Sequence, residues 1–134
     1  MLPFISGELV ATVVVIDDDD FVRTFVCRLL QMFGHQVLAF PDASPALQEV
    51  DFAQVDLVIT DLQMPTPGAV AIQTIRERGF EVPIVVMSGH IEPADADHYI
   101  AMGAQSLLFK PFTIENFWKI TGAWISQTEG QMVG

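Results

Sequence analysis

The 134-residue sequence predicts a single α/β domain in which helices cover both faces of a parallel β-sheet. Short runs of apolar, mostly β-branched residues recur along the chain, as expected of strands that are buried on both faces. Segments with helical spacing of apolar residues separate these runs, so that strand and helix alternate five times. Because crossovers between parallel strands are right-handed, a three-layer α/β/α sandwich with five strands and five helices is the simplest arrangement.

The first two strands and helices occupy residues 12–50. A strand at residues 13–16 leads directly into four aspartates, Asp17 to Asp20. Apolar residues at helical spacing predict a helix that ends near Gly34. A second strand is expected at residues 36–40, and a turn rich in Pro, Asp and Ser then leads into a helix that extends through Val50.

The remaining three strand–helix units follow the same pattern and end on polar residues. The strands are predicted at residues 56–61, 83–88 and 106–110, and they end in Asp61, Ser88 and Lys110. The third helix follows a Pro/Gly loop at 63–68 and reaches about Gly79, the fourth spans 94–102, and the fifth is capped by Thr113 and reaches Trp124. The domain is thus expected at 12–125, with a leader at 1–11 and a tail at 126–134 of little structure.

Composition limits the classes of protein and partner. The formal net charge is −11, from 17 acidic and 6 basic residues, which disfavours direct binding to nucleic acid. The apolar runs are too short to cross a bilayer, and the start of the chain lacks the basic flank of a signal peptide. A single cysteine, Cys27, excludes an intramolecular disulfide and fits a reducing compartment. We therefore expect a cytoplasmic protein that does not bind membranes.

The polar residues at the strand ends predict a site for phosphoryl transfer. In a parallel sheet the carboxyl ends of the strands share one edge, so Asp17, Asp18, Asp61, Ser88 and Lys110 can converge. Carboxylates bind hard divalent cations such as Mg²⁺, and one of them can act as a nucleophile that forms an aspartyl phosphate. The acidic run taken alone fits equally well a solvated turn that caps the following helix.

Four short motifs carry a resemblance to a known family. They are Val-Ile-Asp-Asp at 15–18, Thr-Asp-Leu-Gln-Met-Pro at 60–65, Met-Ser-Gly at 87–89 and Phe-Lys-Pro-Phe at 109–112. In this order, and at these strand ends, the chain resembles the receiver domain of two-component response regulators and is similar to single-domain chemotaxis regulators. The resemblance covers about residues 12–125 and implies a flavodoxin-like fold with strand order 2-1-3-4-5.

The resemblance also implies roles for the site residues. Asp61 would be the phospho-acceptor, Ser88 would hydrogen-bond a phosphoryl oxygen, and Lys110, before a cis bond to Pro111, would pair with Asp61 or its phosphate. The metal ligands would be Asp18 directly, Asp17 mainly through water, Asp61, and the backbone carbonyl of Gln63. The ion would be Mg²⁺, with Mn²⁺ as a substitute.

The partner implied by the resemblance is a histidine kinase or a histidine phosphotransfer protein that donates the phosphoryl group. The chain would then be a switch and not an enzyme, with self-catalysed phosphoryl uptake and slow autodephosphorylation only. Phosphorylation would remodel a protein-binding face built from residues 90–125.

Other polar and aromatic residues receive lesser roles. Asp19 and Asp20 are expected at the rim or in the first turn of the helix. The histidines lack metal-ligand spacing: His35 and His98 are expected at the surface, and His90 at the mouth of the site. Trp118 and Trp124 are six residues apart and do not share a helix face, so at least one is expected to be exposed.

Two departures from the family pattern leave open how phosphorylation would change the protein-binding face. After Met-Pro the family usually runs any residue, an apolar one, a small polar one and Gly, where this chain has Thr66-Pro67-Gly68-Ala69. The last strand carries Leu107 in place of the usual aromatic residue that moves inward on activation. One alternative is therefore a receiver-like binding module that works without phosphorylation. The other is a haloacid-dehalogenase-like phosphatase that uses Asp17 and Asp19, although it leaves the Asp61 motif unexplained.

Overall fold

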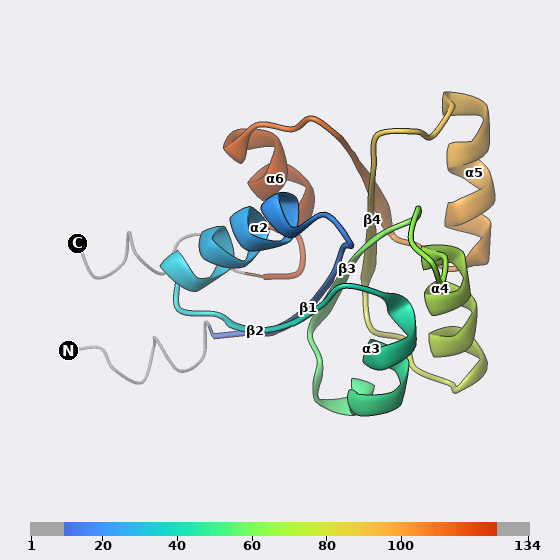
Figure 1. The fold of residues 1–134 in the computed structure, drawn as a ribbon, viewed down its shortest axis with the longest axis horizontal. Coiled ribbons are helices and arrows are strands. Elements are labelled where there is room, and N and C mark those ends of the chain that lie inside the picture. Colours follow the sequence, from blue (N-terminus) through green and yellow to red (C-terminus); the bar gives the residue numbers. More distant parts are fainter. Residues whose placement is uncertain (1–9, 126–134) are drawn as a thin grey trace.

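The sheet and its helices match the predicted architecture (Figure 1). A computed structural model describes residues 10–125; the rest of the predicted leader and the predicted tail at 126–134 lie outside the described residues. The five strands are all parallel, in the order β2-β1-β3-β4-β5. Five α-helices occur in the described part of the chain. The predicted three-layer sandwich, with its flavodoxin-like strand order, is confirmed.

The elements have the following bounds. The strands are β1 (Thr12–Ile16), β2 (Gln36–Phe40), β3 (Leu57–Asp61), β4 (Ile84–Ser88) and β5 (Ser106–Phe109). The helices are α2 (Asp20–Met32), α3 (Ala43–Glu49), α4 (Gly68–Glu77), α5 (Pro93–Met102) and α6 (Ile114–Thr121), with a short 3₁₀ helix η1 (Phe52–Gln54) before β3. None of the helices within residues 10–125 is long and apolar enough to span a membrane.

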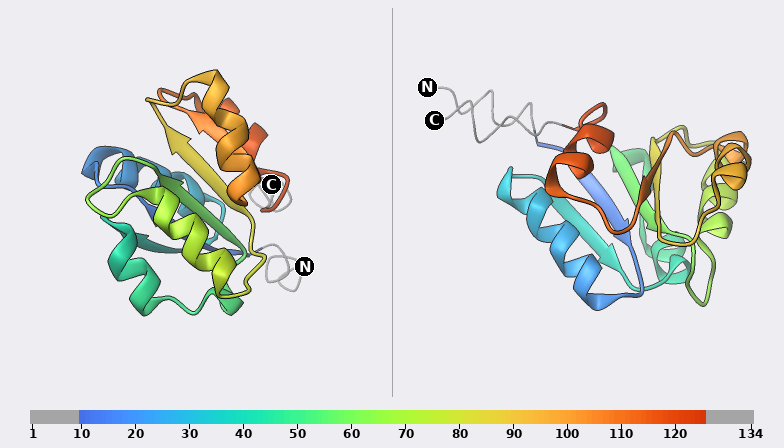
Figure 2. Two further views of the ribbon diagram at one scale, coloured as in Figure 1. Left: turned by 90° about the vertical axis from the view of Figure 1, so that its right-hand side faces the viewer. Right: turned by 90° about the horizontal axis from the view of Figure 1, so that it is seen from above.

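Helices cover both faces of the sheet (Figure 2), and an apolar core lies on each face. Alternate residues of a strand point to opposite faces, so Val14 and Ile16 pack towards α3, α4 and α5. Val13 and Val15 pack towards α2 and α6. β1 and β3 lie inside the sheet and are buried on both faces, which explains their nearly continuous apolar sequence. The site at their carboxyl ends therefore rests on the buried centre of the sheet.

Helix ends follow the predicted signals in most places. Asp19 is the N-cap of α2, and its side chain accepts the backbone N–H groups of Phe21 and Val22. Gly103 ends α5 with φ of 125°, a conformation that favours glycine. The last helix is shorter than predicted, because α6 ends at Thr121 and Trp124 lies in the following turn.

The surface prediction for His35 is wrong. His35 is only 3% exposed, and its Nδ1 accepts the backbone N–H of Ala11 at 2.9 Å. The imidazole thereby satisfies a backbone donor just before β1, where the sheet hydrogen bonds begin. His98 is exposed, as predicted.

The prediction that a tryptophan is exposed is also not met. Trp118 is buried, and its ring lies edge-on to Phe33 and Phe117 with centroids 4.9 and 5.0 Å away. Trp124 is partly buried against the same core. Both rings belong to the core on the α2–α6 side of the sheet.

Two phenylalanines provide a matched test of this packing. Phe117, a residue of α6, is fully buried, whereas Phe21 at the start of α2 is 81% exposed. We expect Phe117→Ala to lower the free energy of unfolding by about 3–5 kcal/mol, because it removes a buried ring and leaves a cavity. Phe21→Ala should change it by about 0.5 kcal/mol or less. Urea denaturation followed by circular dichroism measures both; equal losses would contradict the assignment of the core.

Candidate functional site

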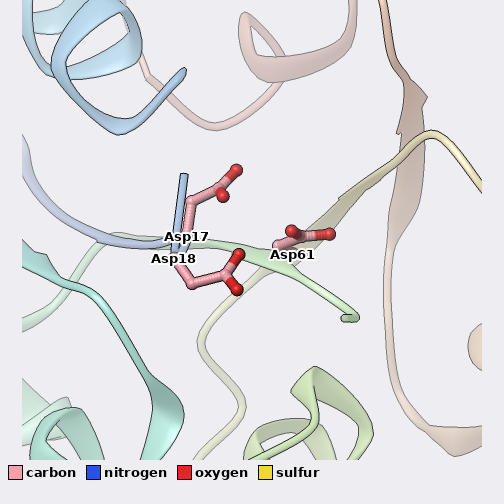
Figure 3. Close-up of side chains that lie close together, drawn as sticks. All are labelled: Asp17, Asp18 and Asp61. Atoms are coloured by element: carbon pink, nitrogen blue, oxygen red, sulfur yellow. The ribbon is translucent and has the colours of Figure 1, made fainter. Parts of the chain in front are cut away.

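The predicted polar residues lie at the carboxyl edge of the sheet. Figure 3 shows three of them, Asp17, Asp18 and Asp61, close together. Asp17 and Asp18 follow β1, Asp61 and Ser88 are the last residues of β3 and β4, and Lys110 follows β5. Ligand oxygens of Asp17, Asp18 and Asp61 all lie within 4.8 Å of one another. Asp17 is 0% and Asp61 6% exposed, whereas Asp18 is exposed. Residues far apart in sequence thus form one acidic cluster, because parallel strands end at the same edge.

Lys110 bridges the two buried carboxylates. Its Nζ lies 2.8 Å from Oδ2 of Asp17 and 3.3 Å from Oδ2 of Asp61. Burial acts to lower the pKa of Lys110, but its hydrogen bond to Asp17 and the charges of Asp17 and Asp61 outweigh this and raise it. The lysine therefore stays protonated at neutral pH and offsets part of the repulsion between the carboxylates.

Burial raises the pKa of Asp17, and the nearby charge of Asp61 acts in the same direction. The hydrogen bonds from Lys110 and from the backbone N–H of Asp19 oppose this shift without cancelling it. The ionised cluster is accordingly short of positive charge, which is a property of sites that bind cations.

Arg23 holds the turn that presents Asp17 and Asp18. Its Nη1 donates to the backbone carbonyl of Asp17 at 2.7 Å, and its guanidinium pairs with Asp20 one helical turn earlier. The sequence reasoning did not single out Arg23. The available signal was an acidic residue three positions before an arginine at the start of a helix.

The chain around Asp61 is packed tightly against α4. Thr60 Oγ1 donates to the backbone carbonyl of Asp61 at 2.9 Å, and the backbone N–H of Leu62 donates to Oδ1 of Asp61 at 2.7 Å. A Cβ atom added at Gly68 would lie 1.9 Å from that same carbonyl oxygen, so no larger residue fits there without a shift of the backbone. The loop whose sequence departs from the family pattern thus closes directly onto the site.

Two cavities lie beside the cluster. The larger, about 610 Å³, is bordered by Asp18, Asp61 and Lys110, with Phe21 and Phe112 among its apolar residues. Gln63 and His90 also line it, and His90 is thus at the mouth of the site, as predicted. Ser88 instead borders a smaller cavity of about 150 Å³, and its Oγ accepts the backbone N–H of His90 at 3.2 Å. The Lys110–Pro111 peptide bond is cis.

Comparison with known proteins identifies the family. The sequence profile described as "Response regulator receiver domain" matches residues 13–121. The chain belongs to the response regulator receiver family. Receiver domains take a phosphoryl group on an aspartate in two-component phosphorelays, and they act as phospho-acceptor switches rather than as conventional enzymes.

Solved receiver structures share the fold over most of this chain. Chemotaxis protein CheY4 of Vibrio cholerae is 30% identical, with a TM-score of 0.75, and the match covers 82% of this chain and 94% of that one. A response regulator receiver domain from Clostridium thermocellum is 25% identical, with a TM-score of 0.76, and the match covers 91% and 99% of the two chains.

Curated relatives include longer regulators. Transcription factor SKN7 of Candida albicans is 35% identical over 109 residues, which is 80% of this chain and 20% of SKN7. Response regulator protein TodT of Pseudomonas putida is 30% identical over 110 residues, which is 81% of this chain and 48% of TodT. The chain thus spans less than half the length of these relatives.

The donor set of the acidic cluster fits a hard divalent cation. Receiver domains bind Mg²⁺ at an acidic cluster, and this chain offers carboxylate oxygens from Asp17, Asp18 and Asp61 in one place. Oxygen ligands are those that Mg²⁺ prefers, and no thiol or imidazole is part of the three-residue group. Lys110 supplies the remaining positive charge.

Replacement of Lys110 tests this charge balance. We expect Lys110→Met to lower the free energy of unfolding by about 3 kcal/mol without divalent cation, because two buried carboxylates lose their partner. Added Mg²⁺ should restore part of that loss, since the cation can take over the neutralisation. Urea denaturation with and without MgCl₂ measures both effects.

Lys119→Met is the matched control, because Lys119 is exposed in the last turn of α6 and the substitution changes the net charge equally. Its effect should stay within about 1 kcal/mol and should not depend on Mg²⁺. A loss in Lys110→Met that equals the control, or that Mg²⁺ leaves unchanged, would contradict this charge balance.

Proposed function

We propose that this receiver takes a phosphoryl group on Asp61 from the phosphohistidine of a histidine kinase or a histidine phosphotransfer protein. The observation that carries the proposal is the position of Asp61. It is a buried carboxylate at the end of a central strand, it borders the large cavity, and it lies beside two further carboxylates and a lysine. We assign this function to a domain that spans residues 12–125.

In the proposed reaction an oxygen of Asp61 attacks phosphorus while the phosphorus–nitrogen bond of the phosphohistidine breaks. The phosphoryl group moves to the aspartate, and the histidine leaves with the electron pair of that bond. The large cavity beside Asp61 provides the approach for the donor side chain. Lys110 already lies 3.3 Å from Asp61, so its ammonium can contact a phosphoryl oxygen after a small movement. The hydroxyl of Ser88, at the end of the adjacent strand, would donate to another.

Asp17, Asp18, Asp61 and the backbone carbonyl of Gln63 would hold the metal ion, with Mg²⁺ as the preferred ion and Mn²⁺ as a substitute. We assign direct contact to Asp18, which is exposed, and contact mainly through water to Asp17, whose Oδ2 is bonded to Lys110. When bound, the cation neutralises the carboxylates and polarises the phosphoryl oxygens. Slow autodephosphorylation would follow when water reaches the same cavity.

We place the output on the face formed by residues 90–125, as a contact with another protein. Ile100 on α5, Phe109 at the end of β5 and Ile114 at the start of α6 are exposed apolar residues of this segment. A net charge of −11 favours a protein partner over nucleic acid. Leu107 is partly buried against the core that faces α3, α4 and α5, so the signal has to reach this face without an aromatic residue at position 107.

We place the phosphoryl transfer in the cytoplasm, where the thiol of Cys27 stays reduced.

Labelling with a small acyl phosphate tests the acceptor. With Mg²⁺ present, we expect the wild-type chain to gain the mass of one phosphoryl group and Asp61→Asn to gain none. Asp56→Asn is the matched control, because Asp56 precedes the same strand at its other end and is exposed. It should label as the wild type does. Intact mass spectrometry, with and without a chelator, measures all three.

Labelling of Asp61→Asn at another residue would contradict the assignment of the acceptor. Turnover of a phosphomonoester that is lost in Asp17→Asn but kept in Asp61→Asn would favour the phosphatase alternative. An affinity for a protein partner that beryllofluoride does not change would favour a module that works without phosphorylation.

A further inference from the structure

The loop between β3 and α4, residues 62–67, carries Gln63 beside the acidic cluster. Its two ends are fixed locally: the backbone N–H of Leu62 donates to Asp61, and the backbone N–H of Gly68 donates to the carbonyl of Leu62 at 3.0 Å. Pro65 and Pro67 have no N–H group, so the middle of the loop has few donors with which to anchor itself.

One contact ties the middle of this loop to another part of the fold. The backbone N–H of Thr66 donates to Oδ1 of Asp42 at 2.7 Å. The backbone N–H of Gln63 donates to Oδ1 of the nearby Asp61 at 3.5 Å. Within residues 10–125, no other backbone N–H of residues 63–67 donates to a residue outside the loop. Burial acts to raise the pKa of Asp42, but hydrogen bonds from Thr66 and Ser44 outweigh it and lower the pKa. The acceptor is therefore a carboxylate, which makes a stronger bond than a neutral oxygen does.

Asp42 is itself held firmly. It is the N-cap of α3, and its Oδ2 accepts the backbone N–H of Ser44 at 3.3 Å. The first turn of α3 is anchored by Ala43 and Ala46, which are fully buried in the core. The Asp42 carboxylate thus joins a packed helix to the loop: Oδ2 accepts from the first turn of α3, and Oδ1 accepts from Thr66 in the loop. Asp51 caps η1 by a similar bond to Ala53 at 3.1 Å but does not contact the loop.

We propose that Asp42 is a positioning residue for the phosphorylation site. It holds the loop at residues 62–67, and with it Gln63, which lines the cavity beside Asp61, so that the carbonyl of Gln63 can complete the proposed ligand set. This inference rests on the proposed function of Asp61 and Gln63. It assigns a part in the reaction to the turn after β2, whereas the groups proposed to contact the phosphoryl group and the metal ion lie at or after the ends of the other four strands.

Asp42→Ser separates the two bonds of the carboxylate. Serine is also a good N-cap residue, so α3 should keep its cap. Its side chain has only one oxygen, so it can accept the N–H of Ser44 but not also the N–H of Thr66. Asp51→Ser is the matched control at a similar cap. In the metal-free protein, the Thr66 amide should exchange with deuterium about tenfold faster in Asp42→Ser than in the wild type, as expected for the loss of one charged hydrogen bond. Asp51→Ser should leave that amide unchanged.

The second readout is the Mg²⁺ concentration that gives half the maximal rate of Asp61 labelling by an acyl phosphate. We expect it to rise about tenfold in Asp42→Ser and to stay unchanged in Asp51→Ser, by analogy with groups that orient metal ligands. The thermal midpoints of the two variants should fall by similar amounts, so that a general loss of stability is separated from the effect on the site.

Three results would overturn the inference. One is a Thr66 amide that exchanges in the wild type like an unprotected amide, and another is an unchanged Mg²⁺ requirement in Asp42→Ser while Asp61→Asn stays unlabelled. In both cases the proposed function of Asp61 stands. A wild-type chain that takes no label on Asp61 would instead overturn the proposed function and this inference together.

Discussion

The ion pairs of Lys110 are the interaction on which the site depends. A parallel sheet delivers Asp17, Asp18 and Asp61 to one edge, and two of these carboxylates are almost completely buried. Buried like charges are costly unless a cation neutralises them. Lys110 directly follows the edge strand β5 and contacts both buried carboxylates. The same shortage of positive charge that the lysine partly corrects is what suits the cluster to a divalent cation. The cation and Lys110 together would then offset the negative charge of a phosphoryl group.

Around these charges, the backbone is fixed by a small number of polar contacts. Arg23 holds the turn after β1, Thr60 and Leu62 fix the carbonyl and carboxylate of Asp61, and Asp42 holds the loop before α4. The Arg23 and Leu62 contacts each join a loop to a neighbouring helix or strand, the Thr60 contact lies within β3, and the Asp42 contact joins the turn before α3 to the loop before α4. The loops that surround the site are therefore tied to the packed parts of the fold.

Much of the fold could be predicted because the local signals agree with the tertiary structure. Apolar runs mark all five strands, and the strand ends alone bring the acidic cluster and Lys110 together. The errors concern residues whose surroundings come from distant segments. His35 is buried where it accepts the N–H of Ala11, 24 positions earlier, and Trp118 is buried where Phe33, at the end of α2, packs against it. The Asp42–Thr66 bond joins two turns in the same way, and Arg23 contacts the Asp17 carbonyl through a turn whose shape the sequence does not specify.

The central claim is that Asp61 is the phosphoryl acceptor of this receiver and that the neighbouring carboxylates and Lys110 serve it. A crystal structure of the chain with Mg²⁺ and beryllofluoride tests this claim most directly. The account predicts beryllium on a carboxylate oxygen of Asp61, a cation in contact with Asp18 and the Gln63 carbonyl, and fluorines in contact with Lys110 and Ser88. Beryllofluoride bound at another residue, or a cation bound away from the cluster, would contradict it.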